Sequence, residues 1–335
     1  MGKSLIKLNS AIISAASVVG KKEHSGPLGS YFDMHDEEDR FGQKTWERAE
    51  AEMQRLAANI ALSKCGMKER DIDAIFAGDL INQCTSSAYG LLEYTVPFFG
   101  IYGACSTAIE GLILSSVMTT SGIYERCLSV TSSHNCSAER QFRTPLEYGA
   151  QRAPTAQWTV TGAGAFVTEN AESKGATGKA KIIEAMPGIS VEKGIRDAGN
   201  MGAAMAPAAL DTLLRYFDES GNEPKDFDVI VTGDLGYEGI SILSDLLLSQ
   251  GVDIGSRLND CGMMMFSRET QDTHAGGSGC GCSASVLASY LLPKLEKGEI
   301  KDMLIIGTGA LMSPDSIKQG LGIPGIAHLI RIKGA

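Results

Sequence analysis

The chain repeats its own sequence pattern, and this repeat constrains the fold more than any other feature. The stretch Asp71-Ile-Asp-Ala-Ile-Phe-Ala-Gly-Asp-Leu80 returns 155 residues later as Asp226-Phe-Asp-Val-Ile-Val-Thr-Gly-Asp-Leu235. Further on, Gly103-Ala-Cys105-Ser-Thr-Ala108 is matched by Gly279-Cys-Gly-Cys282-Ser-Ala-Ser285. Because internal repeats reflect repeated structure, we expect two related halves, residues 1–170 and 171–335. Each half has a cysteine, Cys105 or Cys282, at a matched helix start.

Composition excludes several classes of protein. Thirty basic and forty acidic residues give a formal charge of −10, which repels phosphate backbones and argues against a nucleic-acid partner. Eight cysteines in 335 residues are too few for a disulfide-rich secreted scaffold, so we expect free thiols. Their spacing lacks a zinc pattern, and we expect no metal site and no cofactor of the protein's own.

The apolar stretches favour core elements over membrane segments. Residues 3–20 superficially resemble a signal peptide, but polar residues such as Asn9 and Ser10 dilute the run, and we expect a first core strand there. The longest uncharged stretch, residues 275–293, is rich in Gly, Ser and Cys, which is typical of a tightly packed helix start. We therefore expect no transmembrane segment, and any membrane association would be peripheral.

Hydrophobic periodicity predicts matched elements in both halves. Helical spacing covers residues 46–64 and 204–217, and short buried strands follow at 74–76 and 229–231. Residues 107–118 and 283–295 are apolar nearly all round, as expected of helices in the middle of a protein. Two further strands follow them, at 127–131 and 303–306. The sum is an α/β protein with five layers, α-β-α-β-α, which buries the two central helices against each other.

Cys105 is the strongest candidate for chemistry. It comes directly before a long apolar helix, where unpaired backbone amides and the helix dipole favour the thiolate and lower the thiol pKa. That position suits a nucleophile. A small buried packing residue is the alternative interpretation.

The motif Gly103-Ala-Cys-Ser-Thr-Ala-Ile-Glu-Gly-Leu112 resembles the nucleophile motif of the thiolase superfamily, which includes the condensing enzymes of 3-oxoacyl synthesis. The resemblance implies a duplicated five-layer fold, a homodimer, and an acyl-thioester formed on Cys105. Two departures weaken that activity. Thr232-Gly233-Asp234 occupies the place of a family histidine, and the stretch from Gly277 to Cys282 holds no His or Asn. His274, which lies several residues upstream, is the remaining candidate there.

A narrower resemblance extends over almost the whole chain. The sequence resembles the stage V sporulation protein AD family in a set of segments, which includes Ala77-Gly-Asp-Leu-Ile-Asn-Gln83, Thr131-Ser-Ser-His-Asn135, Thr159-Val-Thr-Gly-Ala-Gly164 and Asn259-Asp-Cys-Gly262. This resemblance implies a thiolase-like protein of spore-forming bacteria, peripheral to the spore inner membrane. It implies that the protein binds dipicolinic acid (pyridine-2,6-dicarboxylate), free or as the calcium chelate. It further implies that, with other stage V sporulation A membrane proteins, it supports uptake into the forespore and release at germination.

A flat dianion needs an apolar slot for its ring and donors for its carboxylates. Residues that follow the strand after the Cys105 helix are expected near the active-site end. We therefore predict that the ligand contacts Cys105, Ser132, Ser133, His134 and one of the two arginines Arg140 and Arg143. Surface ion pairing is the alternative role for the arginines, and a satisfied strand-end residue is the alternative for His134. The acidic residues between Asp33 and Asp39 lack a calcium-loop pattern, so a solvated loop is expected there.

Three functions compete at this stage. The first is a binding protein for dipicolinate that performs no turnover. The second is an active acyltransferase or condensing enzyme, with Cys105 as nucleophile and an unconventional base such as His134. The third is a scaffold for a membrane channel, in which the pocket has no role.

Overall fold

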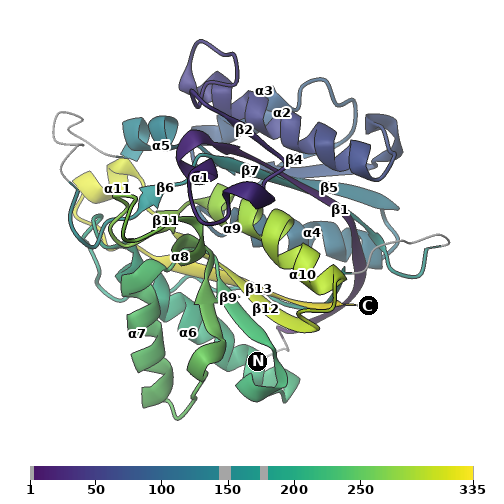
Figure 1. The fold of residues 1–335 in the computed structure, drawn as a ribbon. Coiled ribbons are helices and arrows are strands. Elements are labelled where there is room, and N and C mark those ends of the chain that lie inside the picture. The colour runs from purple at the N-terminus through teal and green to yellow at the C-terminus, as the bar shows by residue number, and fades with distance from the viewer. Residues whose placement is uncertain (1–3, 143–151, 174–179, 335) are drawn as a thin grey trace.

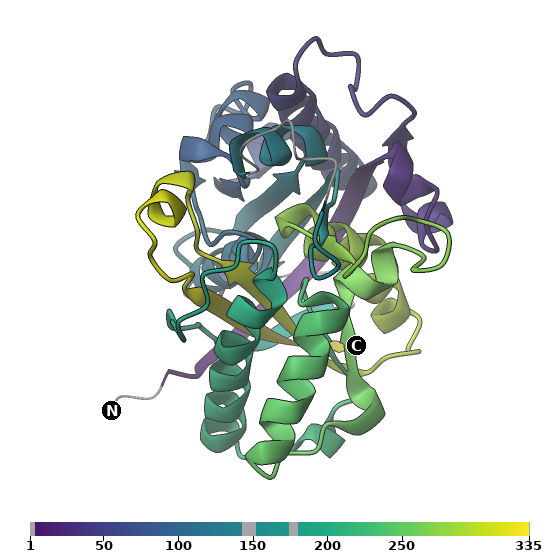
Figure 2. The same cartoon turned by 90° about the vertical axis from the view of Figure 1, so that its left-hand side faces the viewer.

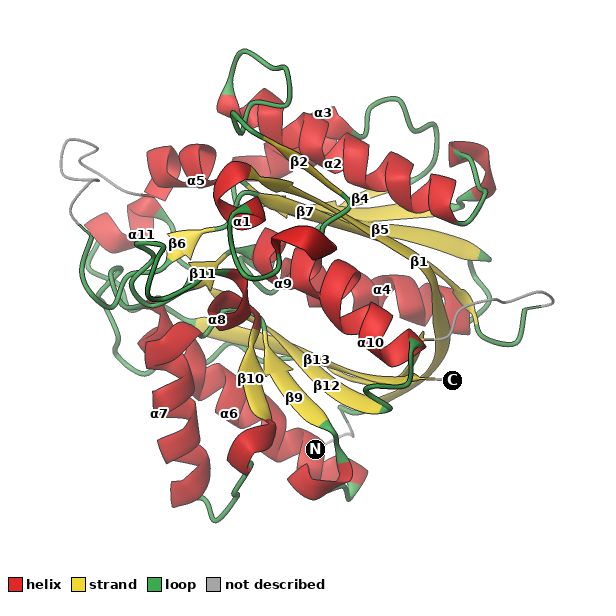
Figure 3. Ribbon diagram, in the orientation of Figure 1, coloured by secondary structure: helices red, strands yellow, loops and turns green. Residues whose placement is uncertain are grey.

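The computed structural model describes residues 4–142, 152–173 and 180–334, and the following account is restricted to them. Five layers are stacked in the order helices, sheet, helices, sheet, helices (Figures 1 and 3). The α/β class and the five-layer arrangement expected from the repeat are therefore confirmed.

The strands of the first half form one sheet layer in the order β1-β7-β5-β3-β4. β3 pairs in parallel with both β5 and β4, whereas β5–β7 and β7–β1 are antiparallel. The bounds are β1 Ile6–Gly20, β3 Ala74–Gly78, β4 Phe98–Gly100, β5 Arg126–Ser133 and β7 Gly162–Asn170, with the short β2, Met34–Asp36, beside the end of β1.

The strands of the second half repeat this pattern in the order β8-β13-β12-β9-β10. β9 again pairs in parallel with two neighbours, and the β12–β13 and β13–β8 pairs are antiparallel. The bounds are β8 Ala180–Met186, β9 Val229–Thr232, β10 Leu258–Asp260, β12 Asp302–Ala310 and β13 Gly325–Gly334. The sequence repeat thus corresponds to a repeat of strand order and direction.

β1 joins the two sheet layers. Its first part, Ile6 to Ile12, pairs with β8, and the part from Ser10 onward pairs with β7. In Figure 1 this long strand curves from one layer to the other (purple, right). The predicted first core strand is confirmed.

The helices fill the three remaining layers. α2 and α3 cover the first sheet and α6 and α7 cover the second, while α4, α9 and α10 lie between the sheets (Figure 3). The central helix predicted over 283–295 consists of α9, a π-helical turn at Leu287–Leu291, and α10. The bounds are α2 Trp46–Lys64, α3 Thr85–Gly90, α4 Thr107–Thr120, α6 Met201–Ser220, α7 Gly236–Ser249, α9 Cys280–Val286 and α10 Leu292–Glu296.

Shorter elements gather at one end of the molecule, which faces the viewer in Figure 2. There β11, Gly277–Ser278, pairs in parallel with β6, Trp158–Thr159. The short helices are α1 Lys21–His24, α5 Asn135–Phe142, α8 Cys261–Met265 and α11 Pro314–Lys318, and of these α5 and α11 lie at this end (Figures 1 and 2).

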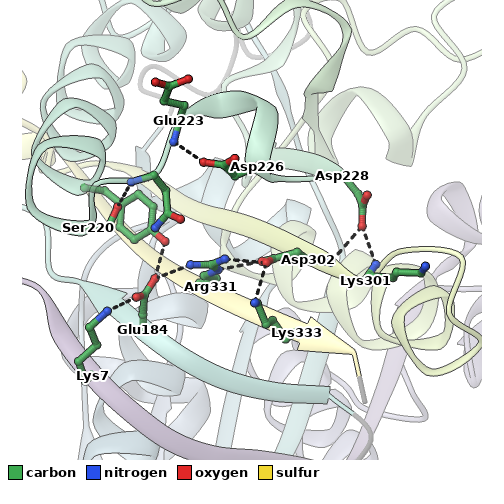
Figure 4. Close-up of polar contacts among 12 residues, drawn as sticks. Lys7, Glu184, Ser220, Glu223, Asp226, Asp228, Lys301, Asp302, Arg331 and Lys333 are labelled. Atoms are coloured by element: carbon green, nitrogen blue, oxygen red, sulfur yellow. Dashed lines mark hydrogen bonds and ion pairs between the residues drawn. The ribbon is translucent and has the colours of Figure 1, made fainter.

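An ion-pair network connects four neighbouring strands where the halves join (Figure 4). The Arg331 guanidinium on β13 donates to both carboxylate oxygens of Asp302 on β12, at 2.9 and 2.7 Å. It also donates to Glu184 on β8 at 3.1 Å, and Glu184 pairs with Lys7 on β1. The Arg331 and Glu184 side chains are about nine-tenths buried, so each needs its partners to remain charged. This network fixes the junction and lies away from the end that holds the site.

Candidate functional site

A sharp turn places Cys105 at the start of α4. Ala104, directly before it, has a φ of +51°, a left-handed conformation that residues other than glycine rarely adopt. The Ser106 N–H closes the turn by donating to the Gly103 carbonyl at 3.1 Å. β12 packs directly against it, since a β-carbon at Gly309 would lie 2.4 Å from the Gly103 carbonyl oxygen. Packing on this strand therefore holds the turn, and with it the thiol, in one position.

Cys105 lies at a cavity of about 280 Å³ to which both halves contribute. Most of the lining is apolar, with side chains that include Leu80, Tyr102, Phe142, Met201, Met312 and Ile317. Among the described residues that line it, the charged ones are Glu139 on α5 and Lys318 on α11. Ligand pockets in proteins are mostly apolar and measure about 300 to 1,000 Å³. This cavity is slightly smaller than that range and suits a small molecule.

A buried carboxylate lies behind the thiol. The Cys105 Sγ is 3.7 Å from the Ser278 Oγ, and the Ser278 hydroxyl donates to Asp234 Oδ2 at 2.9 Å. The same oxygen accepts the Gly279 N–H at 2.9 Å, and Oδ1 accepts the Thr308 hydroxyl at 2.7 Å. Asp234 is 1% exposed. Three donors therefore hold a buried acidic group next to the sulfur.

This environment favours the protonated thiol. Burial raises the pKa of Cys105 well above its usual range, and the nearby Asp234 charge raises it further. Burial also raises the pKa of Asp234. The sequence predicted a lowered thiol pKa from the helix start, and that prediction is wrong because desolvation and a like-signed neighbour outweigh the helix amides. A thiol of high pKa is a poor nucleophile at neutral pH.

The serines predicted from the end of β5 are not among the residues that line the cavity. The Ser132 hydroxyl donates to Glu50 Oε1 at 2.9 Å, and the Ser133 hydroxyl donates to the Val160 carbonyl at 2.7 Å. Both serines are fully buried. They connect the first sheet to the elements packed on it.

His134 is also buried and away from the lining. Its Nδ1 accepts the Cys136 N–H at 3.1 Å, so its proton is on Nε2, which donates to the Asp39 carbonyl at 2.8 Å. Burial lowers the pKa of His134, which keeps the ring neutral. Both ring nitrogens are thus occupied by backbone groups.

The two predicted arginines differ in what the structure says of them. Arg140 is half exposed and forms an ion pair with Glu47 on α2. It is not among the lining residues, although Ala138, Glu139 and Phe142 of the same helix are. Arg143 lies outside the described residues.

Sequence reasoning missed four residues near the thiol: Asp234, Ser278, Thr308 and Cys280. Asp234 stands in the repeated Gly-Asp-Leu segment, which was a usable signal. Cys280, rather than Cys282, packs in one cluster with Cys105. Gly279, with φ +108°, precedes Cys280, and Ala104, with φ +51°, precedes Cys105, so each of these cysteines follows a residue of positive φ.

Cys282 lies instead in the central core, among side chains of α4, α8 and α10. His274, the other polar candidate, pairs with Asp272 and bonds the Ala153 carbonyl at 2.8 Å. Across residues 4–142, 152–173 and 180–334, no group of three or more His, Cys, Asp or Glu side chains is placed to hold a metal ion.

Comparison with known proteins identifies close relatives in sequence. The family model described as stage V sporulation protein AD matches residues 3–333. Stage V sporulation protein AD of Bacillus subtilis (strain 168) is 42% identical over 315 residues, which cover 94% of this chain and 91% of that protein.

Solved structures show the same fold at low sequence identity. The 3-oxoacyl-[acyl-carrier-protein] synthase III of Aquifex aeolicus VF5 has a TM-score of 0.57 and 15% identity, covering 96% of this chain and 99% of its own. The cerulenin-bound OleA of Xanthomonas campestris, from a co-crystal, has a TM-score of 0.60 and 15% identity, covering 97% of each chain. At these identities the likeness concerns the fold alone, which is thiolase-like, as the Cys105 motif had implied.

Proposed function

Because the chain belongs to the stage V sporulation protein AD family, we propose that this sporulation protein binds dipicolinic acid, free or as its calcium chelate, at the Cys105 cavity. In this role it supports uptake of dipicolinate into the forespore and its release at germination. The thiolase-like scaffold then serves recognition and performs no turnover.

The proposal rests on two properties of the site. The raised pKa of Cys105 favours the protonated thiol, and this thiol lines a small apolar cavity. Acyl transfer needs a nucleophilic sulfur, a proton acceptor and an oxyanion donor. Here the pKa of Cys105 is raised, and the hydroxyl of its polar neighbour Ser278 already donates its hydrogen bond to Asp234. The apolar walls, by contrast, suit the flat faces of an aromatic ring.

The alternative function is an acyltransferase or condensing enzyme that uses Cys105. The left-handed turn at Ala104 and the position at the start of α4 favour it, because they resemble the setting of a nucleophile. Asp234 is the nearest acidic group that could receive the thiol proton. Its oxygens already accept three hydrogen bonds, and proton transfer from a thiol of raised pKa to a carboxylate is uphill.

Two measurements on the same preparation separate these functions. Calorimetric titration with dipicolinate, with and without calcium, is expected to show saturable binding. Incubation with an acyl-coenzyme A followed by intact-mass analysis is expected to show no acyl adduct, in the wild type as in Cys105→Ser. A thioester that disappears in Cys105→Ser, together with no heat from dipicolinate, would overturn the proposal in favour of acyl transfer.

The partners and location complete the proposal. We propose peripheral association with the spore inner membrane through other stage V sporulation A membrane proteins, and a homodimer as the oligomeric state. No helix in the part of the chain that the structure describes is long and apolar enough to cross a membrane. Light scattering during gel filtration tests the homodimer, and a monomer at micromolar concentration contradicts it.

A further inference from the structure

The rim of the cavity on the second half is formed by α11 and the chain around it. After β12 ends at Ala310, the chain turns through Met312 into α11, which is capped by the Ser313 hydroxyl accepting the Ser316 N–H at 3.1 Å. Ile317 and Lys318, at the end of this helix, belong to the cavity lining.

This rim is attached to the loop that precedes α6. The Ile323 N–H donates to the Ile195 carbonyl at 2.7 Å, and Val191 forms a bridge with Gly325. That loop contributes further lining residues, among them Gly199. The segment that carries Lys318 therefore belongs to a connected wall of the cavity.

The two sides of the cavity differ in charge for an anionic ligand. Asp234 lies behind the thiol, to which Ser278 connects it. Arg140, on α5, is paired with Glu47. Within the described residues, Lys318 is the cation of the lining, and it forms no ion pair there. A carboxylate that enters near Cys105 approaches Asp234, whereas a carboxylate at the α11 rim meets an ammonium.

We propose that Lys318 holds a carboxylate of the ligand at the α11 rim, so that the cavity selects aromatic carboxylates in one orientation. This inference rests on the proposed function and assigns Lys318 as the residue that binds the ligand's negative charge. The ring occupies the apolar part of the cavity, and its carboxylate edge faces the rim. A lysine suits this position because its ammonium is a point charge on a flexible stem and accepts a range of carboxylate geometries.

The inference predicts that Lys318 affects the binding of free dipicolinate and of its calcium chelate differently. Free dipicolinate carries two negative charges, and the one-to-one calcium chelate is neutral. Because the attraction to Lys318 depends on the ligand's net charge and is partly exposed to solvent, it weakens with salt. Loss of Lys318 should therefore affect the free dianion far more than the chelate.

The test is calorimetry on Lys318→Ala, with Lys318→Arg as the conservative variant and Lys297→Ala, an exposed lysine of the α10 end, as the matched control. Hydrogen bonds to charged groups predict about a tenfold weaker affinity for free dipicolinate in Lys318→Ala. Affinity for the chelate should change less than about twofold, and Lys318→Arg and Lys297→Ala should bind like the wild type. Raising the salt concentration should weaken the wild type more than Lys318→Ala.

Isophthalate, which carries the same two carboxylates without the ring nitrogen, distinguishes failure of this inference from failure of the proposed function. If the wild type binds dipicolinate and Lys318→Ala binds it equally well, only the role of Lys318 is wrong. If the wild type binds isophthalate in a Lys318-dependent manner but does not bind dipicolinate, the role of Lys318 is supported and the proposed function is wrong. Binding of neither ligand overturns both.

Discussion

Replacing Asp234 by asparagine should make the Cys105 thiol more reactive. The two contacts in series, 3.7 Å from the sulfur to Ser278 Oγ and 2.9 Å from there to Asp234 Oδ2, place the charge at most about 6.6 Å from the sulfur. At that distance, with an effective dielectric constant of about 20, a unit charge contributes about 2.5 kcal/mol. That energy equals about two pKa units. Asp234→Asn should therefore lower the thiol pKa by about two units.

The expected change in rate is smaller than the change in thiolate population. Two pKa units give about a hundredfold more thiolate below the pKa, but a thiolate of lower pKa is also a weaker nucleophile, with a Brønsted coefficient of about 0.4 to 0.5. Alkylation of Cys105 should thus become about tenfold faster. The assay is the rate of iodoacetamide labelling at pH 8, followed by mass spectrometry of the Cys105 peptide.

Asp79→Asn is the matched control for this prediction. Asp79 stands in the same Gly-Asp-Leu segment of the first half and accepts hydrogen bonds from Ser87 and the Ile81 N–H. It should change Cys105 labelling by less than about twofold. Asp234→Asn loses one of the two oxygens that accept the Gly279 N–H and the Thr308 hydroxyl, and should cost about 1 to 3 kcal/mol of stability. A thermal melt therefore has to show that the variant is folded. An unchanged labelling rate in folded Asp234→Asn, or equal acceleration in Asp79→Asn, refutes the electrostatic explanation.

Three further substitutions test the packing and the buried charges of the fold. Gly309→Ala places a methyl group against the Gly103 carbonyl and should lower the free energy of unfolding by about 1 to 3 kcal/mol in urea denaturation; a neutral effect contradicts the tight packing. Burial raises the pKa of Glu23 from 4.5 to about 8, so the folded state keeps a proton that the unfolded state releases, and stability falls as pH rises between these values by up to about 1.4 kcal/mol per pH unit. Glu23→Gln should flatten that decline in urea denaturation at pH 5 and pH 8, and parallel slopes would contradict the assignment. Arg331→Met removes the guanidinium that links Glu184 to Asp302, although these carboxylates keep Lys7 and Lys333 as partners, and should lower the melting temperature through a loss of about 1.5 to 3 kcal/mol, with dipicolinate binding unchanged; a change in affinity would show that the network reaches the cavity.

The fold could be predicted from the sequence because the repeat and the hydrophobic periods are local signals. Residues 46–64 have a single apolar stripe and form α2 with the predicted bounds. The two central helices were recognisable from their lack of a polar face. The π-helical turn that separates α9 from α10 was not predicted, because it has no distinct pattern of apolar residues.

The candidate site was only partly predictable because its polar groups come from distant parts of the chain. Cys105 was visible at a helix start, but Asp234 follows β9 and Thr308 belongs to β12, and only the folded sheet brings them beside the same thiol. Ser132, Ser133 and His134 lie at the end of the correct strand, but their side chains bond to other elements. Sequence position indicated the right end of the sheet and could not give side-chain direction.

Protection of Cys105 by dipicolinate tests most directly whether this cavity is a recognition site. N-ethylmaleimide labelling at pH 9 can be followed for each cysteine peptide, with the half-buried Cys65 at the end of α2 as the internal reference. The account predicts that saturating dipicolinate slows labelling of Cys105 and leaves Cys65 unchanged. Labelling of Cys105 at the same rate with and without saturating dipicolinate would contradict it.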